Sequence, residues 1–194
     1  MRTFSALLIA LAWWLLLSTA MLGQQQFVQS DPNNGRPLLL QSMDGTRWEL
    51  PILVYADANV DMFTTQDSLI ASAHSFERNG QYFVLLYSYY KNEYPCKGMF
   101  TAEQKAKIPN FSTICQLLGY KLRWLEVDIN KGLVRISREF LLNTDGNFDS
   151  FGTSSKTWTQ LGTLPRGAVT SAIEAITERM RKEVQKEKLA GRFP

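Results

Sequence analysis

The sequence of 194 residues has only two cysteines, Cys96 and Cys115, and a single histidine, His74. Two cysteines are too few for the dense disulfide framework that stabilises many small secreted domains. One histidine without a cysteine cluster supplies no metal-ligand set, and no G-x-S-x-G motif marks a nucleophilic serine. A net charge of +3 is too small to indicate a nucleic-acid partner. We therefore expect no catalytic site, no cofactor and no metal ion.

Long hydrophobic runs are confined to the N-terminus, where 15 of the first 20 residues are hydrophobic. A short basic start, an apolar stretch over residues 6–17 and the small residues Ser18 and Ala20 have the layout of a signal peptide cleaved after Ala20. The alternative is an uncleaved anchor over residues 4–22, which would be the chain's only contact with a membrane. This segment predicts an exported protein that is periplasmic, on the cell surface or secreted.

The rest of the chain divides at about residue 44. Residues 21–43 include the polar run QQQ and the turn-rich run SDPNNGRP. This composition favours a flexible leader over residues 21–43, followed by a single domain over residues 44–194.

Strand-like segments and turn signals alternate within that domain. Strands are expected over the segments 46–50, 52–56, 68–76, 81–90, 121–129, 133–142 and 156–161. Asn79-Gly80 and Asn130-Lys-Gly132 both resemble hairpin turns. Residues 81–90 are apolar on both alternating faces, so this strand should lie in the sheet centre with a layer packed over each face.

The C-terminal segment changes to a helical period. Apolar residues recur at spacings of three and four from Val169 to Val184, which predicts a helix over about residues 167–189. The expected fold class is α+β, with an antiparallel β-sheet of about five to six strands and this long amphipathic helix packed on one face.

The two cysteines lie 19 positions apart. In an oxidising compartment a Cys96–Cys115 disulfide is the expected state, and closing a loop of about 20 residues would stabilise the fold by about 3 kcal/mol. A redox role is the alternative, although the C-x-x-C spacing that lowers a thiol pKa is absent.

Other groups have both a functional and a structural interpretation. The D-x-N-x-D strings at residues 57–61 and 145–149 resemble the start of a calcium loop, but they lack its glycine and glutamate and favour Asx turns. Tyr87, Tyr89, Tyr90 and Tyr94 would form a stacking platform for sugars or peptides, or core pairs across strands. The basic residues of 179–192 would contact anionic lipid, or form a solvated helix face.

Two carboxylates give the one enzymatic alternative. Glu126 and Asp128 are two positions apart on a predicted strand, so both side chains project from the same face. Such a pair could serve a periplasmic hydrolase as general acid and base. Paired strand carboxylates are more often a solvated face, and His74 is expected to be structural.

Four stretches are similar to those of a known family. MFTTQDSLI, QYFVLLYSYY, EVDINKGLVRISREFLLNTDG and WTQLGTLPRGAV together resemble the bacterial surface-adhesin protein E family. The resemblance covers about two thirds of the chain and implies a small exported protein with an antiparallel sheet and a C-terminal helix. Cys96 and Cys115 depart from the family pattern, because they lie in an apparent insertion, so the tether between helix and sheet is not implied.

The sequence predicts an exported cell-envelope protein without a catalytic site, acting as a binding or structural module. The expected partner is an envelope or extracellular protein or glycan of unknown identity. A periplasmic hydrolase and a membrane-tethered accessory protein are the alternatives.

Overall fold

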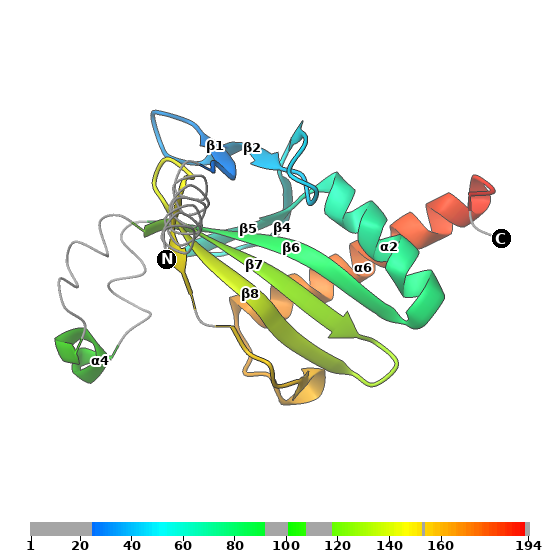
Figure 1. Cartoon of the computed structure of the whole chain (residues 1–194). Coiled ribbons are helices and arrows are strands. Elements are labelled where there is room, and N and C mark those ends of the chain that lie inside the picture. Colours follow the sequence, from blue (N-terminus) through cyan, green and yellow to red (C-terminus); the bar gives the residue numbers. More distant parts are fainter. Residues whose placement is uncertain (1–24, 92–100, 108–117, 153, 193–194) are drawn as a thin grey trace, which may run out of the picture.

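The computed structural model describes residues 25–91, 101–107, 118–152 and 154–192. The fold class is α+β, as predicted, with two antiparallel sheets and helices packed against the larger one (Figure 1). The larger sheet has seven strands in the order β10-β8-β7-β6-β5-β4, with β9 paired to β8, and the smaller has the order β1-β2-β3. Their bounds are β1 Val28–Ser30, β2 Pro37–Gln41, β3 Trp48–Glu49, β4 Ile52–Ala56, β5 Val60–Thr64, β6 Gln81–Tyr90, β7 Leu118–Asp128, β8 Leu133–Asn143, β9 Phe148–Phe151 and β10 Thr159–Gln160.

The centre of the larger sheet agrees with the prediction. β6 spans Gln81–Tyr90 and lies between β5 and β7, and β7 and β8 form a long antiparallel hairpin. Tyr82, Val84 and Leu86 belong to the first core cluster, on the face covered by the C-terminal helix, and Leu85 and Tyr87 belong to the second core cluster, on the other face. β6 is therefore covered on both faces. The predicted last strand is shorter than expected, since β10 covers only Thr159–Gln160 and the 3-10 helix η1, Leu161–Thr163, follows it.

The predicted strand over residues 68–76 is wrong, because this segment belongs to helix α2, Gln66–Asn79. Thr65 caps the helix by accepting a hydrogen bond from the N–H of Ser68. Gly80, expected in a hairpin turn, ends the helix with a φ of 66° and donates its N–H to the carbonyl of Phe76. Leu69, Ala73 and Phe76 lie at helical spacing and pack into the first core cluster.

Helix α2 also takes the place of a strand beside the first half of β6. The hydroxyl of Ser68 accepts a hydrogen bond from the N–H of Leu85 at 2.8 Å, and Thr64 Oγ1 donates to the carbonyl of Leu85 at 2.8 Å. One helical turn later, Ser72 Oγ donates to the carbonyl of Phe83. These three side chains satisfy backbone groups that would otherwise be buried without partners.

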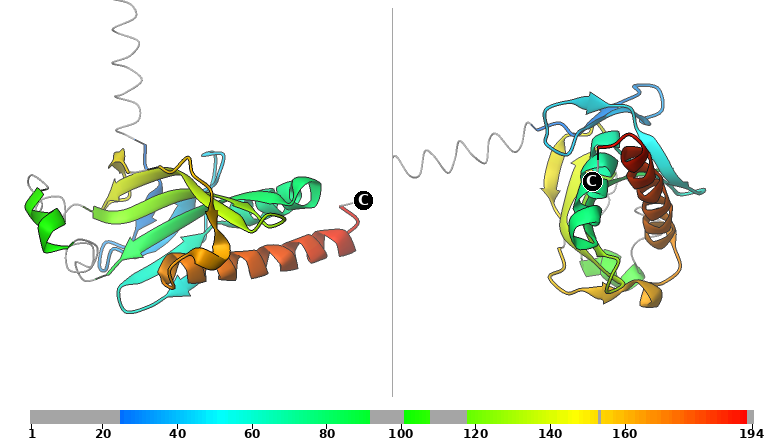
Figure 2. Two further views of the ribbon diagram at one scale, coloured as in Figure 1. Left: turned by 90° about the horizontal axis from the view of Figure 1, so that it is seen from below. Right: turned by 90° about the vertical axis from the view of Figure 1, so that its right-hand side faces the viewer.

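The long C-terminal helix α6, Ala168–Leu189, agrees with the predicted helix. Figure 2 shows it crossing one face of the larger sheet, with α2 beside its second half. Its buried apolar residues pack on the side chains of β6, β7 and α2 in the first core cluster; they are Ala172, Ile173, Ile176, Met180 and Val184. Their spacing of three and four residues explains why the sequence predicted this element correctly.

The flexible leader predicted for residues 21–43 is wrong from residue 25 onward. β1 and β2 pair with each other, and Val28 and Leu40 are fully buried in the second core cluster with Tyr87 and Leu142. The smaller sheet therefore covers the face of the larger sheet opposite α6 (Figures 1 and 2). The polar run DPNNG forms the turn between β1 and β2, and such turn residues explain why the composition of this segment favoured a flexible leader.

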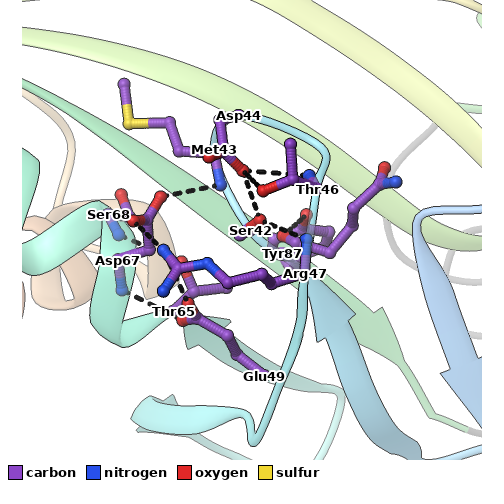
Figure 3. Close-up of polar contacts among 11 residues, drawn as sticks. Ser42, Met43, Asp44, Thr46, Arg47, Glu49, Thr65, Asp67, Ser68 and Tyr87 are labelled. Carbon is purple, nitrogen blue, oxygen red and sulfur yellow. Dashed lines mark hydrogen bonds and ion pairs between the residues drawn. The ribbon is translucent and has the colours of Figure 1, made fainter.

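A polar network attaches the hairpin of the smaller sheet to the start of α2 (Figure 3). Asp67 accepts hydrogen bonds from Arg47 Nη2 at 2.6 Å and from the N–H of Met43 at 3.1 Å. Glu49 accepts a hydrogen bond from the N–H of Asp67 at 3.0 Å and lies 3.7 Å from Arg47. The hairpin is thus held by both packing and charge-assisted hydrogen bonds.

The remaining helix, α4, Ala102–Lys107, lies between the two segments left undescribed in the middle of the chain. In the part of the chain that the structure describes, no helix combines the length and the hydropathy required to span a bilayer. The predicted cleavage site at Ala20 lies outside the described residues, as do Cys96 and Cys115.

Candidate ligand-binding pocket

A pocket of about 510 Å³ opens between the first turn of α6 and the larger sheet. β4 and β5 form one wall, the segment entering α6 forms another, and β6 and β7 contribute one residue each. The lining residues are Tyr55, Asp57, Val60, Met62, Tyr90, Arg123, Leu164, Pro165, Arg166, Gly167, Ala168, Val169 and Thr170. Its volume lies within the range of small-molecule sites, and most of its wall is aliphatic or aromatic.

Arg123 is the buried cation of the pocket lining: it projects from β7 and is only 7% exposed. Its Nε donates to Glu139 Oε2 at 2.7 Å and its Nη1 donates to Ser88 Oγ at 2.8 Å. β6 and β8, the neighbours of β7, supply these partners, so the sheet register fixes the guanidinium. A guanidinium has five N–H donors, and these two bonds leave the others for further acceptors.

Lys121 lies two residues before Arg123 on the same strand and shares its carboxylate. Lys121 Nζ is 3.5 Å from Glu139 Oε1, and both side chains are about nine-tenths buried. Burial lowers the pKa of Lys121, and the neighbouring Arg123 lowers this pKa further. With Lys121 protonated, the cluster of Lys121, Arg123 and Glu139 carries two positive charges and one negative charge.

The acidic group in the pocket wall is Asp57, whose carboxylate is held in a turn. Its Oδ1 accepts hydrogen bonds from the N–H groups of Asn59 and Val60 at 2.7 and 2.8 Å, and its Oδ2 accepts one from Tyr55 Oη at 2.8 Å. Burial opposes ionisation of Asp57, but these hydrogen bonds outweigh it and lower the pKa of the carboxyl. Asp57 is therefore a stable anion with occupied oxygens.

The first turn of α6 completes the pocket. Its N-cap residue, Gly167, has no side chain to accept from the first N–H groups, and the first turn contains no acidic residue. Thr170 turns its hydroxyl back to the carbonyl of Pro165 at 2.7 Å. Helix N-termini of this kind carry a partial positive charge.

The two D-x-N-x-D strings form turns. Asp57 is held as described, while Asp61 is buried in β5 and pairs with Lys91 at 2.6 Å and with Arg36 at 3.5 Å. In the second string, Asn143 Oδ1 accepts hydrogen bonds from the N–H groups of Asp145 and Asn147, both at 3.0 Å. Within the described ranges, no group of three or more His, Cys, Asp or Glu residues could hold a metal ion.

Glu126 and Asp128 lie on β7 as predicted, outside the pocket lining. Glu126 Oε2 is 2.5 Å from Arg135 Nη2, across the β7–β8 hairpin. Asp128 accepts hydrogen bonds from the N–H of Lys131 at 3.0 Å and from Gln81 at 3.1 Å, and these interactions lower its pKa. Each carboxylate is thus bound to its own structural partner.

The predicted tyrosine platform is divided between two faces of the sheet. Tyr87 and Tyr89 donate their hydroxyls to the carbonyls of Gln41 and Asn34, so they attach the smaller sheet to the larger one. Burial raises the pKa of Tyr87. Tyr90 lines the pocket on the opposite face, and Tyr94 lies outside the described residues.

The histidine and the basic end of α6 lie away from the pocket. His74 is exposed on α2 instead of lying in a strand, as the prediction for residues 68–76 implied. In the basic segment, Lys188 pairs with Glu77 of α2 at 2.9 Å, and Arg179 Nη2 donates to the carbonyl of Leu53 at 2.9 Å. These two basic side chains thus attach α6 to α2 and β4.

Lys121, Arg123 and Glu139 are not among the residues predicted from the sequence. The available signal was two cations on one otherwise apolar face of the strand, in the run KLRWL. Their shared carboxylate is a cross-strand neighbour in the hairpin, so its distance along the sequence concealed the pairing. Comparison of the chain with protein-family models, with curated proteins and with solved structures found no match.

Proposed function

We propose that this chain is an exported cell-envelope protein that acts as a non-catalytic binding module, with the pocket beside α6 as its binding site. The observation that carries the proposal is the pocket itself, which combines about 510 Å³ of space with an apolar wall and one fixed guanidinium. Mostly apolar walls with a few oriented polar groups are typical of small-molecule sites.

The chemistry of the lining residues supports binding in preference to catalysis. General-base catalysis needs a carboxylate or imidazole whose pKa lies near the working pH, whereas the pKa of Asp57 is lowered. The carboxylates considered for a hydrolase, Glu126 and Asp128, are held by Arg135 and Lys131 outside this pocket. The resemblance to the surface-adhesin protein E family supports an exported protein as well.

Export rests on the N-terminal segment and is tested on the full chain. We expect the protein, expressed in a Gram-negative host, to be released with the periplasmic fraction and to begin at Met21 by N-terminal mass spectrometry. An intact Met1 in the membrane fraction would indicate the tethered accessory protein, and an intact Met1 in the cytosol would contradict export.

Binding is tested with the neutral fluorescent probe N-phenyl-1-naphthylamine. We expect saturable one-to-one fluorescence enhancement by the mature protein and its loss in Ala168→Trp, which fills the pocket at the start of α6. Ala190→Trp introduces the same side chain at the exposed far end of α6 and should bind the probe as the wild type does. Absence of saturable binding, or equal binding by Ala168→Trp in a folded state, would overturn the proposed site.

A further inference from the structure

The charges around the pocket beside α6 are unequal. Arg123 and Arg166 line it together with a single described carboxylate, Asp57. The oxygens of Asp57 already accept three hydrogen bonds from its own turn. Asp57 therefore has little capacity left to accept from a ligand, whereas Arg123 has N–H groups beyond the two that bond Glu139 and Ser88.

Removing the charge of Arg123 from water is unfavourable, and its hydrogen-bond partners compensate this desolvation only in part. Glu139 is shared between Arg123 at 2.7 Å and Lys121 at 3.5 Å, so one carboxylate serves two cations. Burying a cation without a full counter-charge is unfavourable, and a further anion beside Arg123 would relieve that imbalance. The bonds to Glu139 and Ser88 fix the guanidinium, so an incoming acceptor would meet a pre-positioned donor.

The rest of the pocket wall is mostly apolar and favours an apolar group. Val60, Met62, Leu164, Ala168 and Val169 present aliphatic surface, and Tyr55 and Tyr90 add aromatic rings. A fully hydrophilic anion, such as inorganic phosphate, would leave this surface in contact with water. A ligand with an apolar body and one anionic group matches both parts of the wall.

We infer that the pocket binds an anionic amphiphile, a small molecule with one carboxylate or similar anionic group beside Arg123 and an aliphatic or aromatic body against Val60, Met62 and Val169. This inference rests on the proposed function, because it names the ligand class of the same pocket. The uncapped first turn of α6 supports it, since its N–H groups favour negative charge nearby.

The test compares three ligands of equal chain length that differ in charge: octanoate, octan-1-ol and octylammonium. Each displaces bound N-phenyl-1-naphthylamine from the mature protein at pH 7.5 and low salt, below its micelle concentration. We expect octanoate to displace the probe at a concentration at least about tenfold lower than octan-1-ol, with octylammonium the weakest.

Variants test whether Arg123 is the positive charge that makes octanoate bind more tightly than octan-1-ol. Arg123→Met leaves Lys121 as the partner of Glu139, and it should weaken octanoate about tenfold or more while octan-1-ol changes less than about twofold. Arg138→Met is the matched control, because Arg138 lies on Trp124 on the other face of the sheet, and it should leave both affinities unchanged. If Arg123→Met does not fold, Arg166→Ala is measured instead. We expect it to weaken octanoate binding by a smaller factor and to leave octan-1-ol binding unchanged.

The outcomes separate the two proposals. Equal displacement by octanoate and octan-1-ol, or an equal loss of both in Arg123→Met, would overturn the anionic ligand and leave the binding function in place. Tighter binding of octylammonium would likewise overturn it. Failure of N-phenyl-1-naphthylamine to bind at all would overturn the proposed function and this inference together.

Discussion

The hydroxyl of Ser68 in helix α2 accepts a hydrogen bond from the N–H of Leu85 in strand β6, at 2.8 Å and fully buried. One turn along the helix, Ser72 donates to the carbonyl of Phe83. Two serines four residues apart in the helix thus bond to two backbone groups whose residues, Leu85 and Phe83, are two apart in the strand. This arrangement lets a helix continue the sheet edge after β5 ends at Thr64.

Replacing this hydroxyl tests how much the helix-to-strand bond contributes. We expect Ser68→Ala to lower the free energy of unfolding by about 1–3 kcal/mol, because it leaves the N–H of Leu85 buried without a partner. Ser75→Ala in the same helix is the control and should stay within about 0.5 kcal/mol of the wild type. Urea unfolding followed by circular dichroism measures both, and equal losses would contradict the role of Ser68.

The contacts between α2 and β6 also explain why this segment was wrongly predicted as a strand. The run SLIASAHSF is short, lacks charge and contains β-branched and aromatic residues, so its apolar pattern fits either element. Its helical state depends on the capping residues Thr65 and Gly80. It also depends on two serines whose hydrogen bonds to β6 form only when the chain folds. By contrast, β6, the β7–β8 hairpin and α6 were predicted correctly because their patterns are long and regular.

Two leucines of β2 test whether residues 25–43 belong to the folded domain. Leu40 is fully buried against the second core cluster, whereas Leu38 is 52% exposed. We expect Leu40→Ala to destabilise the protein by about 2–5 kcal/mol, and Leu38→Ala by less than about 0.5 kcal/mol. If chemical denaturation showed no effect of Leu40→Ala, a flexible leader would describe this segment after all.

The network around Asp67 should control the opening of the smaller sheet. Asp67→Ala removes the acceptor for Arg47 and for the N–H of Met43, and it should cost about 1–3 kcal/mol. We expect faster hydrogen exchange at Ser42, whose N–H is bonded to the carbonyl of Arg47.

The control for this network is Glu178→Ala, which breaks an exposed pair with Lys182 on α6. It should change stability by less than about 0.5 kcal/mol and leave exchange at Ser42 unaltered. Exchange at Ser42 that stays slow in Asp67→Ala would show that packing alone holds the hairpin.

Acid should weaken the β2–β3 turn through Asp44. Hydrogen bonds from the side chains of Thr46 and Ser42, and from the N–H of Thr46, lower the pKa of Asp44 from 3.8 to about 2. The unfolded chain therefore binds a proton more readily, so the contribution of Asp44 is complete above about pH 4 and is lost as the pH falls toward 2.

This linkage is measured as the difference between wild type and Asp44→Asn. The wild type should lose stability relative to the variant between about pH 4 and pH 2, while the difference between them stays constant above pH 5. Urea unfolding at several pH values provides the curves. A difference that is constant over the whole range would contradict the role of these hydrogen bonds.

The pocket was harder to predict than the fold. Sequence spacing identified Glu126 and Asp128 because they are two residues apart, but the structure pairs Glu126 with Arg135 and Asp128 with Lys131. Arg123 and Glu139 are 16 positions apart and meet only through the register of β7 and β8. The pocket also needs the start of α6 to lie over β4 and β5, which no local pattern of residues specifies.

The central claim is that the pocket beside α6 is the binding site of this protein. The most direct test is a two-dimensional ¹H–¹⁵N NMR titration of the mature protein with octanoate, which locates binding residue by residue. We expect saturable shifts concentrated at the amides of Val60, Tyr90, Arg123, Ala168 and Val169, and their absence in Ala168→Trp. Shifts centred on Trp124 and Arg138 across the sheet, or no saturable shifts at all, would contradict the claim.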